Sequence, residues 1–170
     1  MCVDLSIHMV SEPYASLLER LLAELRREFG DKLVSMVVFG SVARGDNRRD
    51  SDIDLLLVVE GIPPTVTGRV RLFEKVEDRL SIEDLRSKGY DVSFSPVIKT
   101  PAEAVRLIPL YLDMVDDAVI LYDKDAFFTR VLERLRRRLS ELGAERVRVG
   151  KKWYWRLKKD FKWGEVVVIE

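Results

Sequence analysis

Cysteine and histidine are nearly absent from this chain. Its 170 residues include one of each, Cys2 and His8. A single cysteine cannot form an intrachain disulfide, and protein zinc sites are built from several cysteine and histidine ligands. A disulfide-stapled scaffold and a zinc site are therefore both excluded.

Amide side chains are also scarce. Glutamine does not occur and asparagine occurs once, at Asn47, whereas 34% of the residues are charged. Loss of labile amides together with enrichment in arginine, glutamate and lysine is typical of proteins from thermophiles. The composition therefore indicates a thermophilic source and says nothing of the chemistry.

Neither an excess of charge nor a long apolar run is present. The 29 basic and 29 acidic residues balance, so no overall field attracts nucleic acid or an anionic membrane. No apolar run approaches the length that spans a membrane, and the N-terminus lacks the cationic start of a signal peptide and is interrupted by Asp4. We expect a cytoplasmic protein without membrane contact.

The pattern of apolar residues predicts both helices and strands. The chain is long enough for one domain of ordinary size with a packed core. Helices are predicted at about 12–29, 69–87, 101–114 and 124–142, with Pro109 bending the third. Strands are predicted at 33–39, 53–59, 90–98 and 118–122. The first two strands are joined by the one stretch that carries a chemical pattern.

This stretch begins with a turn suited to phosphate. Gly40 and Ser41 follow the apolar run 33–39. A glycine there lets a ligand approach the backbone closely, and the N–H groups beyond it can hold a phosphate. Ser41 adds a hydroxyl, and Arg44 adds a planar guanidinium that suits phosphate oxygens. An ion pair of Arg44 with Asp46 or Asp50 is an equally good interpretation, and Asp46 itself is expected to order the loop.

Two carboxylates complete the pattern. Asp52 and Asp54 flank Ile53 at the start of an apolar run that continues to Val59. Such a short, β-branched run indicates a buried strand, and residues two apart on a strand share a face. Two like charges so close are unfavourable unless a cation lies between them. The pair therefore predicts a site for a divalent metal ion.

The ordered set of residues resembles a known signature. Gly40-Ser41, Arg44-Gly45-Asp46 and Ser51-Asp52-Ile53-Asp54-Leu55 together are similar to the signature of the DNA polymerase β-like nucleotidyltransferase superfamily, particularly its minimal nucleotidyltransferase members. The resemblance covers about residues 12–100. It implies an α/β (α+β) fold, with the mixed sheet of the polymerase β palm and helices packed mainly on one face.

The resemblance also implies an activity. The chain would transfer a nucleoside monophosphate, expected to be AMP, from ATP or another nucleoside triphosphate to an unidentified hydroxyl acceptor by a two-metal mechanism. Asp52, Asp54 and Asp91 would be the catalytic residues and the ligands of Mg²⁺ or Mn²⁺. Gly40, Ser41 and Arg44 would bind the phosphates. Members of the superfamily modify RNA ends, antibiotics and other proteins, so the acceptor stays open.

The assignment of Asp91 has an alternative. The third aspartate of the superfamily is typically followed by two apolar residues, whereas Asp91 is followed by Val92 and then Ser93. A shift in strand register would place a serine in that role and leave the third carboxylate missing. Asp91 would then be a solvated aspartate after the turn at Gly89.

The C-terminal part is expected to be an appendage. We expect a nucleotidyltransferase core at 1–122 and, at 123–170, a helix followed by an aromatic and basic tail packed on the core. All three tryptophans lie among lysines at 151–164. Such a tail could stack on nucleic-acid bases. The favoured interpretation is that its aromatic residues fix a terminal strand at 165–169 against the body or a second subunit.

Partners other than the nucleotide stay as hypotheses. Minimal nucleotidyltransferases often pair with a small helical protein, and the resemblance therefore allows an antitoxin-like or regulatory role with weak or no catalysis. A homodimer is a further possibility. Nucleic-acid binding by the tail is the weakest of the three.

Overall fold

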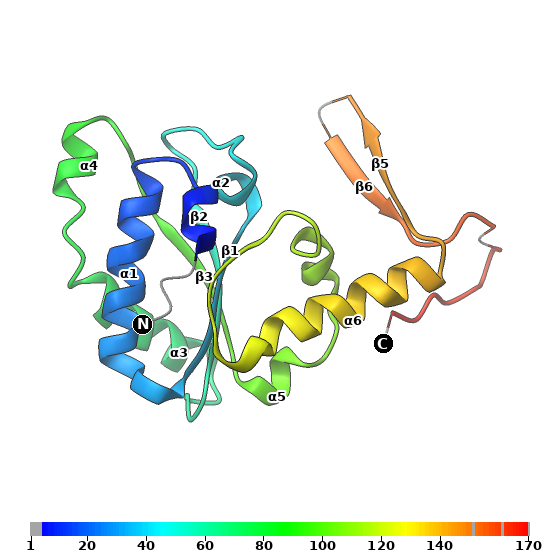
Figure 1. The fold of residues 1–170 in the computed structure, drawn as a ribbon, viewed down its shortest axis with the longest axis horizontal. Helices are drawn as coiled ribbons and strands as arrows, with labels where there is room; N and C mark the ends of the chain where they lie inside the picture. Colours follow the sequence, from blue (N-terminus) through cyan, green and yellow to red (C-terminus); the bar gives the residue numbers. More distant parts are fainter. Residues whose placement is uncertain (1–4, 151, 161, 170) are drawn as a thin grey trace.

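A four-stranded mixed sheet forms the centre of the molecule in the computed structural model, which describes residues 5–150, 152–160 and 162–169 (Figure 1). The strand order is β3-β2-β1-β4. β1 is antiparallel to both β2 and β4, and β2 is parallel to β3. The strands are β1 (Leu33–Phe39), β2 (Ile53–Val59), β3 (Phe94–Lys99) and β4 (Val119–Asp123). β1 and β2 are the central strands, which explains why their sequences are almost continuously apolar.

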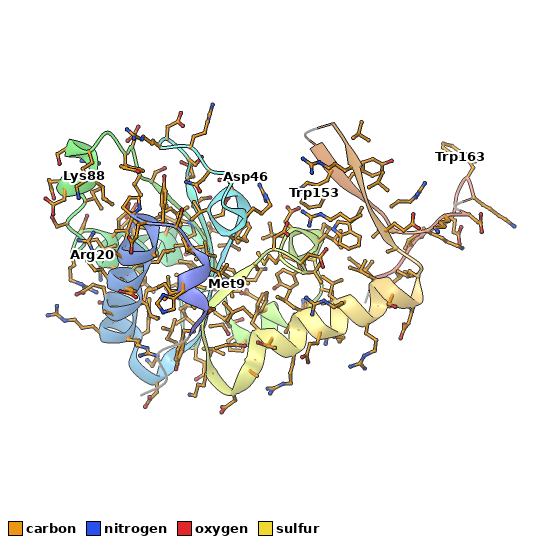
Figure 2. All side chains as sticks on the ribbon, turned by 45° about the horizontal axis from the view of Figure 1, so that its top comes forward. Met9, Arg20, Asp46, Lys88, Trp153 and Trp163 are labelled. Carbon is orange, nitrogen blue, oxygen red and sulfur yellow. The ribbon has the colours of Figure 1, made fainter. Side chains whose placement is uncertain are left out.

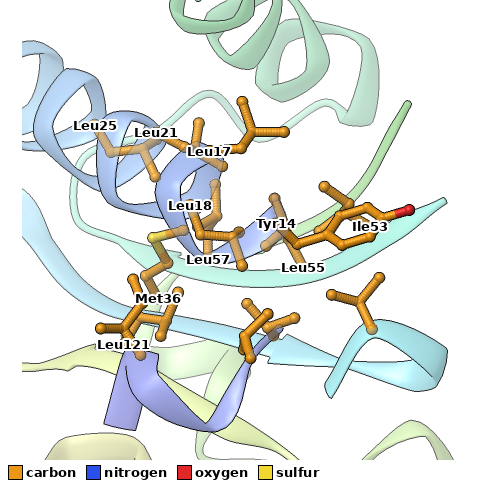
Figure 3. Packing of buried hydrophobic residues seen from close by; sticks show 14 of the residues in the cluster. Tyr14, Leu17, Leu18, Leu21, Leu25, Met36, Ile53, Leu55, Leu57 and Leu121 are labelled. Atoms are coloured by element: carbon orange, nitrogen blue, oxygen red, sulfur yellow. The ribbon is translucent and has the colours of Figure 1, made fainter. Parts of the chain in front are cut away.

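One face of the sheet is covered by the N-terminal half of the chain. Leucines on the inner side of α1, among them Leu17 and Leu21, pack in one buried cluster with Met36 and Leu57 of the sheet (Figure 3). The elements of this layer are η1 (Leu5–Met9), α1 (Tyr14–Phe29), η2 (Gly30–Lys32), α3 (Val66–Glu77) and α4 (Glu83–Ser87).

The opposite face is covered by a second layer. Tyr111 and Phe128 pack edge to face with ring centroids 5.2 Å apart, and the Tyr111 hydroxyl donates to the Ala104 carbonyl at 3.0 Å. The elements are α5 (Pro101–Ala104), η3 (Pro109–Asp113), η4 (Lys124–Ala126) and α6 (Phe127–Glu141). The mixed α/β fold is thus confirmed, but helices cover both faces of its sheet and not mainly one, because each face buries its own apolar cluster (Figure 1).

Two predicted helices are shorter in the structure than their patterns suggested. The helix predicted at 69–87 is divided into α3 and α4. The helix predicted at 101–114 ends at Ala104, and a 3-10 turn begins at Pro109. Ile108 is extended (φ −129°, ψ 156°) because a residue that precedes proline is disfavoured in the helical region.

A β-hairpin replaces the predicted terminal strand. Residues 165–169 form no strand, whereas β5 (Glu145–Val149) pairs with β6 (Lys152–Arg156). The hairpin follows α6 and projects beyond the main sheet (Figure 1). Two of the three tryptophans of the tail, Trp153 and Trp155, therefore lie on a two-stranded element, and Trp163 lies beyond it.

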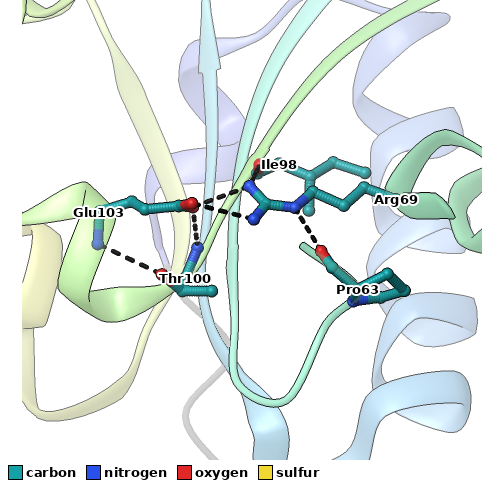
Figure 4. Close-up of polar contacts among 5 residues, drawn as sticks. All are labelled: Pro63, Arg69, Ile98, Thr100 and Glu103. Carbon is teal, nitrogen blue, oxygen red and sulfur yellow. Dashed lines mark hydrogen bonds and ion pairs between the residues drawn. The ribbon is translucent and has the colours of Figure 1, made fainter. Parts of the chain in front are cut away.

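A partly buried arginine joins three segments near the end of β3. Arg69 donates from Nε to the Pro63 carbonyl at 2.8 Å and from Nη1 to the Ile98 carbonyl at 3.0 Å, and forms a bidentate ion pair with Glu103 (Figure 4). Glu103 also accepts from the Thr100 amide at 2.9 Å, which completes the capping box of α5. These donors lower the pKa of Glu103 to about 2.

Within the described ranges, no helix combines the length and the apolarity that crossing a membrane requires.

Candidate active site

The glycine at the end of β1 lies directly against a carboxylate. Gly40 has a φ of 72°, a conformation that glycine adopts without strain. A Cβ atom at this position would collide with Oδ2 of Asp54. The turn and the carboxylate are therefore in contact, and only glycine permits their approach.

A short helix follows this glycine. α2 (Gly40–Arg44) begins where β1 ends, and Gly45, with a φ of 74°, terminates it. Its first amides lack intrahelical acceptors, as at the start of any helix, and are free to donate to an anion. Ser41 is partly buried, and its carbonyl accepts from the Asp46 amide at 3.1 Å. The turn thus has the backbone donors that phosphate binding needs.

The two carboxylates of the motif lie at the start of β2. Asp54 is level with Phe39 of β1 and with Ser95 of β3, and it is partly buried, whereas Asp52 is exposed. Burial raises the pKa of Asp54, the charge of Asp52 raises it further, and the Arg44 guanidinium opposes this shift. The two carboxylates are therefore close enough for the charge of Asp52 to affect the pKa of Asp54.

Asp91 does not join this pair. The parallel register places Phe94 beside Ile53, and the Ile53 amide donates to the Ser93 carbonyl at 2.9 Å. The residue level with Asp52 is therefore Ser93, whose hydroxyl donates to the Asp52 carboxylate. Asp91 lies before the strand, and its amide donates to the Arg49 carbonyl at 2.9 Å. Its role as a third ligand stays a prediction, which this register does not favour.

Arg44 forms an ion pair with Asp46, which is one of the two interpretations of its sequence position. Its Nε lies 3.3 Å from Oδ2 of Asp46, and its side chain is 27% exposed. Its positive charge also reaches Asp54, because it lowers the pKa of that carboxyl. Asp46 therefore holds Arg44 at the edge of the candidate site.

The loop between α2 and β2 is anchored to the body on its far side. The Tyr14 hydroxyl donates to the Arg48 carbonyl at 2.9 Å. The guanidinium of Arg49 lies 5.2 Å from the ring centroid of Tyr90, which packs against Tyr14. These contacts fix the end of the loop and thereby the position of Asp52, which follows it.

One further carboxylate was missed by sequence reasoning. Asp113, at the end of η3, is near enough for its negative charge to raise the pKa of both Asp54 and Arg146. No motif marks it, since it comes to the site from the second helical layer. Only the packing of η3 on the sheet could have identified it.

A cavity of about 510 Å³ lies beside α2, and neither Asp52 nor Asp54 is among its lining residues. It begins at Ala43, Arg44 and Asp46 and extends to the β5–β6 hairpin, where Trp153 forms part of its lining (Figure 2). Sequence reasoning considered the tryptophans only as a tail. Arginine recurs at every second position in 145–149, and tryptophan does so in 153–155. This alternation could have shown that Trp153 and Trp155 lie on one face of a strand.

The residues present fit a divalent cation. Asp52 and Asp54 supply hard oxygen donors, and two like charges so close together favour a cation between them. Among residues 5–150, 152–160 and 162–169, no group of three His, Cys, Asp or Glu is placed to hold a metal. Mg²⁺ commonly uses only one or two carboxylates together with substrate phosphates and water, so two suffice.

Comparisons with known sequences agree on a family. The profile of the nucleotidyltransferase domain family matches residues 18–114. Two proteins of Methanocaldococcus jannaschii, each named as a candidate protein adenylyltransferase, are similar to this chain. One is 31% identical over 123 residues, which is 71% of this chain and 80% of the relative. The other is 37% identical over 68 residues, or 40% of this chain and 61% of the relative.

Solved structures show only a distant likeness. A crystal structure of a toxin–antitoxin with AMP-PNP matches with a TM-score of 0.45 and 19% identity, over 74% of this chain and 92% of that one. A nucleotidyltransferase structure from Sulfolobus solfataricus matches with a TM-score of 0.42 and 21% identity, over 74% and 94%. Likeness of this degree supports no conclusion about activity.

Proposed function

The chain belongs to the nucleotidyltransferase domain family, and we propose that it transfers AMP from ATP to a hydroxyl group of a protein. The observation that carries this proposal is the contact between Gly40 and the Asp54 carboxylate. It joins a phosphate-binding turn and a cation-binding pair in one site. The names of the two relatives support adenylyl transfer with a protein as acceptor.

The reaction forms one bond and breaks one. The acceptor oxygen bonds to the α-phosphorus of ATP, and the bond from this phosphorus to the oxygen that bridges to the β-phosphate breaks. Pyrophosphate leaves with the electron pair, and the hydroxyl proton passes to water. The product is a phosphodiester between AMP and the acceptor.

Each residue of the motif has a part in this proposal. The α2 amides and Ser41 would bind the terminal phosphates, and Arg44 would reinforce them. Asp52 and Asp54 would hold a divalent cation, which when bound supplies charge neutralisation at the reacting phosphate. The Ser93 hydroxyl orients the Asp52 carboxylate. Asp91 is retained only as the predicted further ligand.

The test is transfer of label from α-³²P-ATP to protein or peptide acceptors in the presence of Mg²⁺. Asp52→Asn and Asp54→Asn should each lower transfer by about 100-fold or more, because each removes a negatively charged donor to the cation. Asp50→Asn is the matched control, since Asp50 lies in the same loop but pairs with Arg48 at 3.3 Å. It should leave transfer unchanged.

Two results would contradict the proposal. One is equal transfer by the wild type and by Asp52→Asn. The other is a wild-type protein that binds Mg-ATP and labels no acceptor. This second result would favour the alternative of an antitoxin-like or regulatory partner with weak or no catalysis.

A further inference from the structure

The β5–β6 hairpin has two chemically different faces. Side chains alternate along a strand, and the register pairs Arg146 with Trp155 and Arg148 with Trp153. These four residues therefore share one face, called here the inner face. Tyr154 lies on the opposite face and is 51% exposed. The inner face thus gathers arginine and tryptophan on one side.

The inner face is fixed to the body of the protein. Trp155 donates from Nε1 to the Leu112 carbonyl at 3.0 Å, and Arg146 donates from Nη1 to Asp117 at 3.0 Å. The Arg146 guanidinium also lies 3.8 Å from the ring centroid of Trp153. An isolated two-stranded hairpin is only marginally stable, so these contacts determine where it lies. The hairpin is a wall in a defined position.

This wall encloses the cavity beside the candidate active site. Arg146, Arg148 and Trp153 of the hairpin line the 510 Å³ space, as do Ala43, Arg44 and Asp46. Trp153 and Asp46 are labelled in Figure 2. The volume falls in the range of small-ligand and side-chain pockets, about 300–1,000 Å³. The remaining lining residues include Met9, Asp116, Asp117 and Ala118.

The cavity is linked to the carboxylates through α2. Ala43 and Arg44 at the end of this helix line the cavity. Gly40 at its start lies directly against the Asp54 carboxylate. A group that enters the cavity therefore lies next to the site of transfer.

The position of the wall in the sequence indicates which substrate it serves. The family profile ends at residue 114, whereas the wall lies at 146–153. The residues proposed to hold the nucleotide and its cation all lie inside the matched segment, so the wall outside it is available for the other substrate, the acceptor. Resting on the adenylyl transfer proposed above, we infer that the inner face forms one side of the acceptor site. Its occupant is a polypeptide segment that carries the acceptor hydroxyl.

The charges of the cavity favour polypeptide over RNA. Three arginines are matched by three aspartates among the lining residues, Arg44, Arg146, Arg148, Asp46, Asp116 and Asp117. A phosphate backbone needs an excess of positive charge, which this set does not supply. Tryptophan and arginine are also the residue types that contribute most at protein interfaces.

The experiment compares Trp153→Ala with its neighbour Tyr154→Ala. Degenerate heptapeptides centred on Tyr, Ser or Thr are labelled with α-³²P-ATP and Mg²⁺, and ATP binding is measured separately. Trp153→Ala should raise the KM for the labelled peptide pool about tenfold or more, while the Kd for ATP changes less than about twofold. Tyr154→Ala, on the opposite face of the same strand, should change neither.

A second variant covers a folding failure of the first. Arg148 is exposed, so Arg148→Asp removes no buried packing and is not expected to unfold the hairpin. This variant should also raise the peptide KM. If circular dichroism shows that Trp153→Ala is unfolded, Arg148→Asp decides the question.

Several outcomes would overturn the inference. The first is an unchanged peptide KM in the folded variants. The second is a Kd for ATP that rises as much as the peptide KM. The third is a wild-type protein that labels a mixed-sequence RNA and no peptide. If Asp52→Asn abolishes transfer but the hairpin variants Trp153→Ala and Arg148→Asp do not affect it, only this inference is contradicted. Absence of all transfer by the wild type would sink the proposed function with it.

Discussion

Gly40 and Asp54 are not adjacent in sequence, yet the Asp54 carboxylate occupies the space that a side chain at residue 40 would need. The glycine is needed both for its positive φ and because a side chain would occupy the space of the carboxylate. At the residue scale, the candidate site is thus a contact between the end of one strand and the start of the next. Its chemistry depends on an atom that is absent, the Cβ of residue 40.

Gly40→Ala should abolish transfer as well as reduce stability. The added methyl must displace the Asp54 carboxylate, and the left-handed backbone costs about 1–2 kcal/mol in addition. Gly143→Ala is the control, since Gly143 also has a positive φ (64°) but has open space around it. It should lower the urea midpoint similarly and keep full activity. Equal activity in the two variants would show that the contact with Asp54 is unimportant.

Asp91 and Ser93 give a direct test of the strand register. Asp91→Asn should change transfer by less than about threefold, because Asp91 is exposed and lies outside the carboxylate pair. Ser93→Asp should add a third carboxylate beside Asp52, so its melting temperature should rise more steeply with Mg²⁺ than that of the wild type. If Asp91→Asn lowers transfer as much as Asp52→Asn does, the prediction that Asp91 is a third metal ligand is supported.

At the element scale, the polar contacts of Arg69 hold β3 in line with the two helical segments around it. Arg69 is on α3, its carbonyl partners are on the loop after β2 and on β3, and Glu103 is on α5 (Figure 4). β3 carries Ser95 beside Asp54, and the extended chain just before it places Ser93 beside Asp52. The ion pair therefore stabilises the strand that borders the candidate site.

The stabilising effect of this ion pair should depend on pH in a defined window. The pKa of Glu103 is lowered from 4.5 to about 2, so its contribution is fully present above about pH 4.5 and is lost as the pH falls toward 2. Urea unfolding should show Glu103→Gln less stable than the wild type at pH 7, with the difference shrinking at pH 3 and below. The exposed Glu60→Gln serves as control. A difference that stays constant across this range would refute the assignment.

The hairpin shows a different relation between element and neighbour. Its strands pair only with each other, so its position depends on a few contacts such as that of Trp155 with the Leu112 carbonyl. In the part of the chain that the structure describes, the hairpin that lines the cavity is thus positioned by side-chain contacts with the body and not by strand pairing with the main sheet.

At the scale of the whole molecule, two layers of helices enclose the sheet and deliver different parts to one end of it. The N-terminal layer packs behind the motif and anchors its loop through Tyr14. The C-terminal layer brings Asp113, and the hairpin beyond α6 brings Trp153. The proposed nucleotide side therefore comes from the family segment, and the proposed acceptor side comes from outside it.

The sequence by itself determined the core of this protein. Continuous apolar runs identified β1 and β2 because strands buried on both faces need no polar residues, and the spacing of Asp52 and Asp54 placed both on one face. The glycine and serine between these strands identified the turn. Local patterns of this kind can be read from sequence because they depend on neighbours along the chain.

Only the tertiary structure decided the rest. The register between β2 and β3 placed Ser93, and not Asp91, level with Asp52, since a shift along a strand changes the partner without changing the sequence pattern. Pro109 and the helix breaks placed Asp113 near Asp54, and the pairing of β5 with β6 turned a basic aromatic tail into a wall. These outcomes depend on contacts between segments far apart in the chain, which is why no local motif records them.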